Sequence, residues 1–201
     1  INPVRTGYSA IADEWVPIKP GTDGALFLAL IHEIINQGLY DREFLVRYSN
    51  SAQLVNQQRD SSEFGMFVRA EIPEEEGCFD PQNKLWWDRL TGKPMVTHTE
   101  GADPYLLGEY TLDDGTKVKP AFQLLVDRVK HYTPEWASGI TGISVATIKR
   151  LAYEMGITAR DQKIELPIAW TDIWGKEHEF VTGNPVAFHA MRGLAAHSNA
   201  F

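Results

Sequence analysis

The chain has 201 residues, of which 43% are hydrophobic, and it carries a formal net charge of −8. This length and apolar content are enough for one domain, or one and a half, with a buried core. The acidic balance argues against a surface for nucleic acid or anionic membrane, because phosphate groups are bound by clustered Lys and Arg. Four cations do lie near one another, but acidic residues surround them and a solvated face is the better interpretation. They are Lys117, Lys119, Arg128 and Lys130.

Hydropathy and cysteine content limit the class of protein further. No apolar run approaches the roughly 20 residues that a bilayer requires, and the first residues show no signal-peptide pattern. One cysteine, Cys78, cannot form a disulfide or an all-cysteine metal or iron–sulfur site within these residues. The chain starts on Ile1 without a Met and ends in a mixed apolar and polar run, so we expect a piece of a longer protein.

The amino-terminal quarter predicts a strand, a loop and two helices. The strand-like run Val16-Pro17-Ile18 stops at Lys19-Pro20-Gly21. Apolar residues then recur at helical spacing from about Ala25 to Asn36, which predicts a helix with one wide buried stripe. A shorter helix follows, with Asp41 as its cap.

Residues 50–118 differ from the rest in being polar, acidic and rich in turn signals. Strand-like segments flank Thr91-Gly92-Lys93-Pro94, and a stronger hairpin has Asp114-Gly115 at its turn. We expect an irregular insertion that contains small antiparallel hairpins.

Helical patterns return after the insertion. Thr133 and Ser144 are the expected caps of two helices, and Gly156 is expected to end the second of them. Two apolar segments follow, 163–170 and 185–197, of the kind that forms buried strands of a parallel sheet.

This order of elements favours an α/β layer architecture, because helices and strands alternate at both ends with an insertion between them. The predicted divisions are an α/β portion at 1–49, the insertion at 50–118, and further helices and strands of the same α/β domain at 119–201.

The turn before the first long helix is the strongest candidate for a binding site. A helix amino end preceded by Gly21 exposes unpaired amide groups and a partial positive charge, and Thr22 adds a hydroxyl. Asp23 has two possible roles. It caps its own helix, or it accepts two hydrogen bonds from the amino and ring N–H groups of a guanine.

The carboxyl-terminal stretch holds a second candidate cluster. An apolar run ends at Arg192 and Gly193, and His197, Ser198 and Asn199 follow closely. Open α/β sheets bind ligands beyond the carboxyl ends of their strands, where such a cluster belongs. For Ser198 and Asn199, capping of a following helix is an equal alternative.

The sequence supplies no complete catalytic set. Its six histidines show no HExxH or paired ligand spacing, and the Glu-His-Glu run at 177–179 is better interpreted as a solvated turn than as a metal site. GxSxG, Walker A and GxGxxG motifs do not occur.

Three longer runs carry a family signal. They are NPVRTGYSAIADEWVPIKPGTDGALFLALIHEIINQGLYDREFLVRY, DGTKVKPAFQLLVDRVKHYTPEWASGITGISVATIKRLAYE and MRGLAAHSNAF. Together they resemble the molybdopterin oxidoreductases of the dimethyl sulfoxide reductase superfamily. The resemblance covers most of the chain and is weak only between about 50 and 105, which is interpreted as a subgroup insertion.

The resemblance implies a Rossmann-like, three-layer parallel sheet with flanking helices, which holds bis(molybdopterin guanine dinucleotide) with molybdenum or tungsten. It implies that Gly21, Thr22 and Asp23 hold the guanosine end of one pterin dinucleotide, with Asp23 reading the guanine. It also implies that Arg192 and His197 approach the pterin near the metal.

The family also implies what lies elsewhere. Its metal-ligating residue and the cysteines of a 4Fe–4S cluster are expected upstream, so these residues alone are expected to be inactive. Expected partners are the rest of the catalytic subunit, an iron–sulfur electron-transfer subunit, and also a membrane-anchor subunit, with no nucleic acid. The family implies a prokaryotic, periplasmic or membrane-associated enzyme of two-electron redox chemistry. The alternative is a non-catalytic α/β binding or interaction module that uses the same helix end for a nucleotide or a simple anion.

Overall fold

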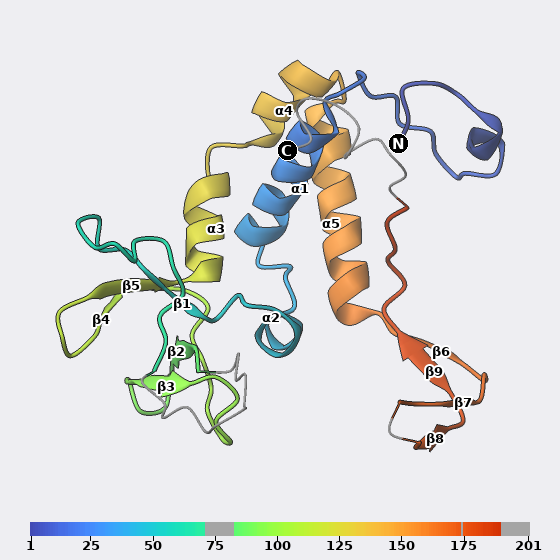
Figure 1. Ribbon diagram of the computed structural model, residues 1–201. Helices are drawn as coiled ribbons and strands as arrows, with labels where there is room; N and C mark the ends of the chain where they lie inside the picture. Colours follow the sequence, from blue (N-terminus) through green and yellow to red (C-terminus); the bar gives the residue numbers. More distant parts are fainter. Residues whose placement is uncertain (71–82, 174, 190–201) are drawn as a thin grey trace. The chain divides into compact units, whose positions relative to one another are not determined.

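The computed structural model describes residues 1–70, 83–173 and 175–189 (Figure 1). The chain divides into two compact units. Unit 1 contains Ile1–Tyr40 and the chain from Val129 onward, and unit 2 contains Asp41–Arg128. The predicted insertion, 50–118, lies wholly within unit 2.

Three helices form the centre of unit 1 (Figure 1). They are α1 (Asp23–Asn36), α4 (Pro134–Thr141) and α5 (Val145–Asp161), and each packs against the other two. Each helix buries an apolar stripe, because amphipathic helices are stable when such stripes face one another. The buried side chains are small or aliphatic: Val16, Ile18, Leu26, Ala29, Leu30, Ala137, Ile143, Ile148 and Ala152. The predicted helix over 25–36 is therefore confirmed.

The caps of α4 and α5 are those that the sequence predicts. Thr133 Oγ1 accepts a hydrogen bond from the Trp136 amide, and Ser144 Oγ accepts one from the Thr147 amide. Pro134 occupies the first turn of α4, where its missing N–H costs no helical hydrogen bond. Local sequence therefore determines where both helices begin.

The predicted end of α5 at Gly156 is wrong, because the helix continues to Asp161. Gly156 lies where α5 passes Leu39, and a Cβ added to it would be 2.7 Å from the Leu39 Cβ. A close approach of packed chain segments, and not a left-handed helix end, accounts for this glycine.

The other described elements of unit 1 are a 3₁₀ turn and two small ribbons, each of two antiparallel strands. The strands of the first ribbon are β6 and β9, and those of the second are β7 and β8. Their bounds are η1 (Gly7–Ala10), β6 (Ile164–Leu166), β7 (Trp170–Thr171), β8 (Glu177–His178) and β9 (Val181–Gly183). The strand-like run at 16–18 buries Val16 and Ile18 but joins no strand ladder among the described residues.

Unit 2 contains a three-stranded antiparallel sheet in the order β1-β5-β4, a separate β2–β3 hairpin and two helices. Both predicted hairpins are confirmed. Asp41 caps the first helix through a bond from the Phe44 amide, as expected. The elements are α2 (Arg42–Tyr48), β1 (Leu54–Asn56), β2 (Leu85–Trp87), β3 (Pro94–Val96), β4 (Tyr110–Thr111), β5 (Lys117–Pro120) and α3 (Ala121–Val129).

A buried carboxylate organises the turn of the β2–β3 hairpin. Asp88 is 1% exposed, and it accepts hydrogen bonds from the Thr91 amide and hydroxyl and from the Asp103 amide, each at 2.8 Å. The bond from the Asp103 amide, helped by those from Thr91, holds the pKa of Asp88 below its ordinary value, although burial opposes this. Asp88 therefore serves as a structural anion in this turn.

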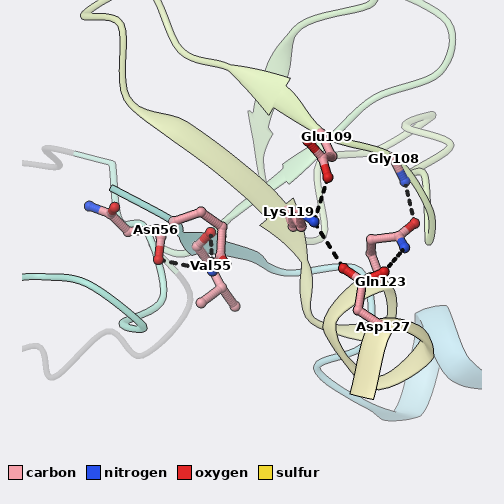
Figure 2. A network of polar contacts seen from close by, with 8 residues as sticks. Val55, Asn56, Gly108, Glu109, Lys119, Gln123 and Asp127 are labelled. Carbon is pink, nitrogen blue, oxygen red and sulfur yellow. Dashed lines mark hydrogen bonds and ion pairs between the residues drawn. The ribbon is translucent and has the colours of Figure 1, made fainter. Parts of the chain in front are cut away.

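A lysine links β5 to α3 (Figure 2). Lys119 Nζ lies 2.9 Å from Asp127 Oδ2 and also pairs with Glu109, just before β4. Gln123 Nε2 donates to Asp127 Oδ1, and Gln123 Oε1 accepts from the Gly108 amide, both at 3.0 Å. The network connects three parts of unit 2 through charge-assisted bonds.

This network predicts a dependence of stability on alkaline pH. Bonding to Glu109, and then to Asp127, raises the pKa of Lys119 above its ordinary 10.5. Because the folded-state pKa is the higher one, the contribution is complete below pH 10.5 and is lost as pH rises through the folded-state pKa.

Lys119→Met is expected to lower the free energy of unfolding of unit 2 at neutral pH by up to about 1 kcal/mol. The difference in unfolding free energy between Lys119→Met and the unmodified protein should become smaller above pH 10.5. The measurement is hydrogen exchange of α3 amides as a function of pH, with exposed Lys117→Met on the same strand as control. A pH-independent cost would contradict the assignment to charge.

All strand ladders in the described residues are antiparallel. The Rossmann-like parallel sheet therefore stays a prediction for the longer protein.

Candidate functional site

The turn before α1 is closed by hydrogen bonds to one carbonyl group. Lys19 O accepts from the Thr22 hydroxyl at 2.7 Å and from the Thr22 amide at 3.3 Å. Gly21, between them, has φ of 76°. This left-handed backbone favours glycine and explains why the chain needs Gly21 at this bend.

The end of α4 holds this turn in place. The Lys19 amide donates to Thr141 O at 3.0 Å. Thr141 is itself 1% exposed; its hydroxyl donates to Ala137 O at 2.8 Å and accepts from the Ile143 amide at 3.1 Å. A buried threonine therefore anchors the candidate site, although it lies 122 positions after Lys19 (141 minus 19).

Sequence reasoning missed this anchor. The available signal was Gly142, which has φ of 80° and ends α4 as a left-handed cap. A side chain at this position would lie 3.5 Å from Lys19 Cε. That distance is an ordinary van der Waals contact, so the left-handed backbone, and not crowding by Lys19, accounts for this glycine.

The first turn of α1 differs from those of α2, α4 and α5 in having no side-chain cap. Thr22 occupies the N-cap position, but its side chain accepts no hydrogen bond from the helix. Thr22 O accepts from the Ala25 and Leu26 amides at 3.0 and 3.3 Å. Among the described residues, no hydrogen bond outside the helix itself is found for the Gly24 amide, which lies in the first turn of α1.

The described residues leave space beside this turn. A Cβ added to Gly21 or to Gly24 would meet no atom of the described residues within 4 Å. Both glycines are partly buried, as are Thr22 and Asp23. Asp23 is the first residue of α1, where a carboxylate interacts favourably with the helix dipole. The turn thus combines backbone N–H donors, a hydroxyl and a carboxylate with room for an approaching group.

Two predicted site residues, Arg192 and His197, lie outside the described residues. The chain just before them contacts α1. The rings of Phe188 and Phe27 meet edge to face, with centroids 5.8 Å apart. Phe27 lies one helical turn after Asp23. The described chain therefore reaches the amino-terminal half of α1 four positions before Arg192.

The histidine of the Glu-His-Glu run contacts an aspartate and a tryptophan that precede it in the chain. His178 Nε2 lies 3.1 Å from Asp172 Oδ2, and its ring stacks on Trp170 at 4.5 Å. Across the described ranges, no group of three or more potential metal ligands occurs. None of the helices seen in these ranges is long and apolar enough to cross a membrane.

Comparison with known proteins identifies relatives along the whole chain. It is 68% identical over 201 residues to a sulfite dehydrogenase subunit of Allochromatium vinosum, and the match covers 100% of this chain and 21% of that protein. It is 32% identical over 153 residues to a putative dimethyl sulfoxide reductase catalytic subunit of Halobacterium salinarum, covering 76% of the chain and 17% of the relative. No protein-family model matches.

The name of a third relative includes its cofactor. The molybdopterin-containing subunit of an arsenate respiratory reductase from Chrysiogenes arsenatis is 28% identical over 165 residues, which cover 79% of this chain and 13% of the relative. The chain belongs to the molybdopterin oxidoreductases. The chain spans at most about a fifth of the length of these relatives. Several molybdopterin oxidoreductases related to it are named as subunits, which implies further subunits in those enzymes.

Proposed function

We propose that this chain is a cofactor-binding part of the catalytic subunit of a molybdenum- or tungsten-dependent oxidoreductase. The observation that carries the proposal is 68% identity over the full 201 residues to a sulfite dehydrogenase subunit. In this proposal the cofactor is bis(molybdopterin guanine dinucleotide). The metal-ligating residue and a 4Fe–4S cluster belong to polypeptide outside these residues, which alone have no turnover.

The turn before α1 would hold the guanosine end of one pterin dinucleotide. Within the described residues, no atom lies near a Cβ added to Gly21 or Gly24, and the Gly24 amide has no partner outside the helix; both observations are compatible with a ligand that approaches the backbone closely. The Thr22 hydroxyl donates to Lys19 O, which leaves its lone pairs as acceptors. The Asp23 carboxylate would accept from the amino and ring N–H groups of the guanine.

Arg192 and His197 would approach the pterin nearer the metal. The contact between Phe188 and Phe27 supports this part of the proposal, because it brings the described chain to α1 shortly before Arg192. The cofactor supplies the two-electron chemistry, and the residues of this chain bind and orient it.

The proposed substrate of the whole protein is sulfite, which is named in the relative with 68% identity. Sulfite and water then give sulfate, two protons and two electrons. Those electrons would leave through iron–sulfur groups to an electron-transfer subunit. The other proposed partner is a membrane-anchor subunit.

The test uses the intact parent protein, purified under conditions that preserve its cofactor. We expect about one metal and about two guanine dinucleotides per catalytic chain, and sulfite-dependent reduction of an artificial electron acceptor. Dimethyl sulfoxide and arsenate are tested as alternative substrates, each as an oxidant that the protein would reduce. Absence of guanine nucleotide would contradict the cofactor assignment, whereas a loaded protein that is inactive on sulfite would contradict only the substrate.

A further inference from the structure

Strands β6 and β9 form a two-stranded antiparallel ribbon (Figure 1). Its register and sequence give it one apolar and one polar face. Leu166 lies opposite Val181, and Ile164 lies opposite Gly183. Residues directly opposite each other share a face, and successive residues alternate between faces. Leu166, Val181 and Ile164 therefore share one face, which we call the apolar face, and Glu165 and Thr182 share the other.

The apolar face is exposed in this chain. Ile164 and Leu166 are 45% and 44% exposed, and Val181 is 37% exposed. Further large apolar side chains nearby in the sequence are also exposed: Ile168, Trp170, Ile173 and Phe180. An isolated two-stranded ribbon is marginally stable in water and needs a further layer or strand to bury its apolar side. The pattern of this ribbon therefore requires a covering partner.

The composition of the face favours a covering from the same polypeptide. Its side chains are Ile, Leu and Val, which are typical of domain interiors. Interfaces between separately folded proteins are instead enriched in Tyr, Trp, Phe, Met and Arg at their centres, and the three side chains of the apolar face include none of these types. In the described residues β6 has a strand partner on one edge alone, so its other edge is open to a further strand.

The relatives contain further polypeptide that could cover this apolar face. The chain corresponds to 21% of the sulfite dehydrogenase subunit, so about four fifths of such a subunit lies outside it. We propose that the apolar face formed by Ile164, Leu166 and Val181 is covered by the remaining polypeptide of the same catalytic subunit. This inference rests on the proposed function, because it takes the chain to be part of that larger subunit.

The experiment measures the accessibility of each face in the full-length catalytic subunit. Leu166→Cys and Val181→Cys report on the apolar face, and Glu165→Cys and Thr182→Cys are controls on the polar face of the same strands. Each variant is treated with a maleimide reagent, and modification of the site is followed by mass spectrometry of its peptide. The catalytic subunit is tested by itself, at several concentrations, and in its complex with the other subunits.

We expect positions 166 and 181 to react at least about tenfold more slowly than 165 and 182 in the isolated catalytic subunit, at every concentration. Equal rates on the two faces would overturn the proposal. Protection that appears only in the complex would assign the face to a different subunit. Protection that appears only at high concentration would assign it to a second copy. Either result overturns the covering by the same polypeptide.

Metal and guanine nucleotide are measured in the same preparations. A protected apolar face in a protein without guanine nucleotide would contradict the cofactor assignment and leave the covering in place. A loaded protein with an unprotected face would contradict only the covering. The two failures are therefore distinguishable.

Discussion

Replacing Asp23 with Asn in the intact protein is expected to weaken retention of guanine nucleotide by about 10- to 100-fold. A hydrogen bond to a charged group contributes about 1.5–3 kcal/mol, and each 1.4 kcal/mol corresponds to about tenfold in affinity. Asparagine keeps the shape of the side chain but replaces one acceptor oxygen by a donor N–H₂ group. That group opposes the donors of a guanine. The measurement is guanine nucleotide and metal per chain after gel filtration.

The control separates base recognition from helix capping. Asp41 caps α2 through the Phe44 amide, so Asp41→Ala removes a cap at a cost of about 1 kcal/mol. It should leave guanine nucleotide content unchanged. If Asp23→Asn lowers the protection of α1 amides from hydrogen exchange and leaves nucleotide retention intact, Asp23 stabilises the helix and does not read the base.

The helix starts were predictable because their causes are local. Thr133, Ser144 and Asp41 each bond to an amide three positions later, and such a bond needs no other part of the chain. The hairpin turns are equally local. A single sequence contains all the information that these features require.

Gly156 shows where local reasoning fails. Glycine at the end of an apolar helical run has two physical explanations, a left-handed terminator and a close contact. The sequence around Gly156 is compatible with both, and Leu39, more than a hundred positions away, decides between them. Tertiary packing therefore overrides the local signal.

The candidate site also has one part that follows from local sequence and one part that depends on tertiary contacts. The bend at Gly21 and the start of α1 follow from a short stretch that the sequence displays directly. Its support by Thr141 depends on a bond between the Lys19 amide and a carbonyl at the end of α4. Backbone bonds of this kind do not specify the side chains of either partner, so Gly142 could indicate the end of α4 but not the bond from Lys19.

For β6 the sequence predicts more burial than the structure of this chain has. Its apolar sequence predicts a buried strand, yet Ile164 and Leu166 are exposed within this chain. Burial depends on what surrounds a strand as well as on the strand itself. The prediction therefore concerns the longer polypeptide, in agreement with the covering proposed for the apolar face.

Replacing Ile148 with Ala is expected to give a large loss of stability in unit 1. Ile148 is 0% exposed, and it belongs to the core formed by α1, α4 and α5. Removing a buried aliphatic side chain costs the lost transfer free energy and leaves a cavity, together about 2–5 kcal/mol. The better helix propensity of alanine offsets only a few tenths of a kcal/mol.

Ile140→Ala is the matched control, because it makes the same change on α4 at a side chain that is 36% exposed. Its expected cost is within about 1 kcal/mol. Hydrogen exchange in the intact protein reports the local free energy of opening, so amides of α1 and α5 should lose protection in Ile148→Ala and keep it in Ile140→Ala. Because Thr141 anchors Lys19 from the end of α4, loosening this core should also reduce nucleotide retention. Unchanged protection in Ile148→Ala would mean that the three helices are stabilised mainly by polypeptide outside this chain.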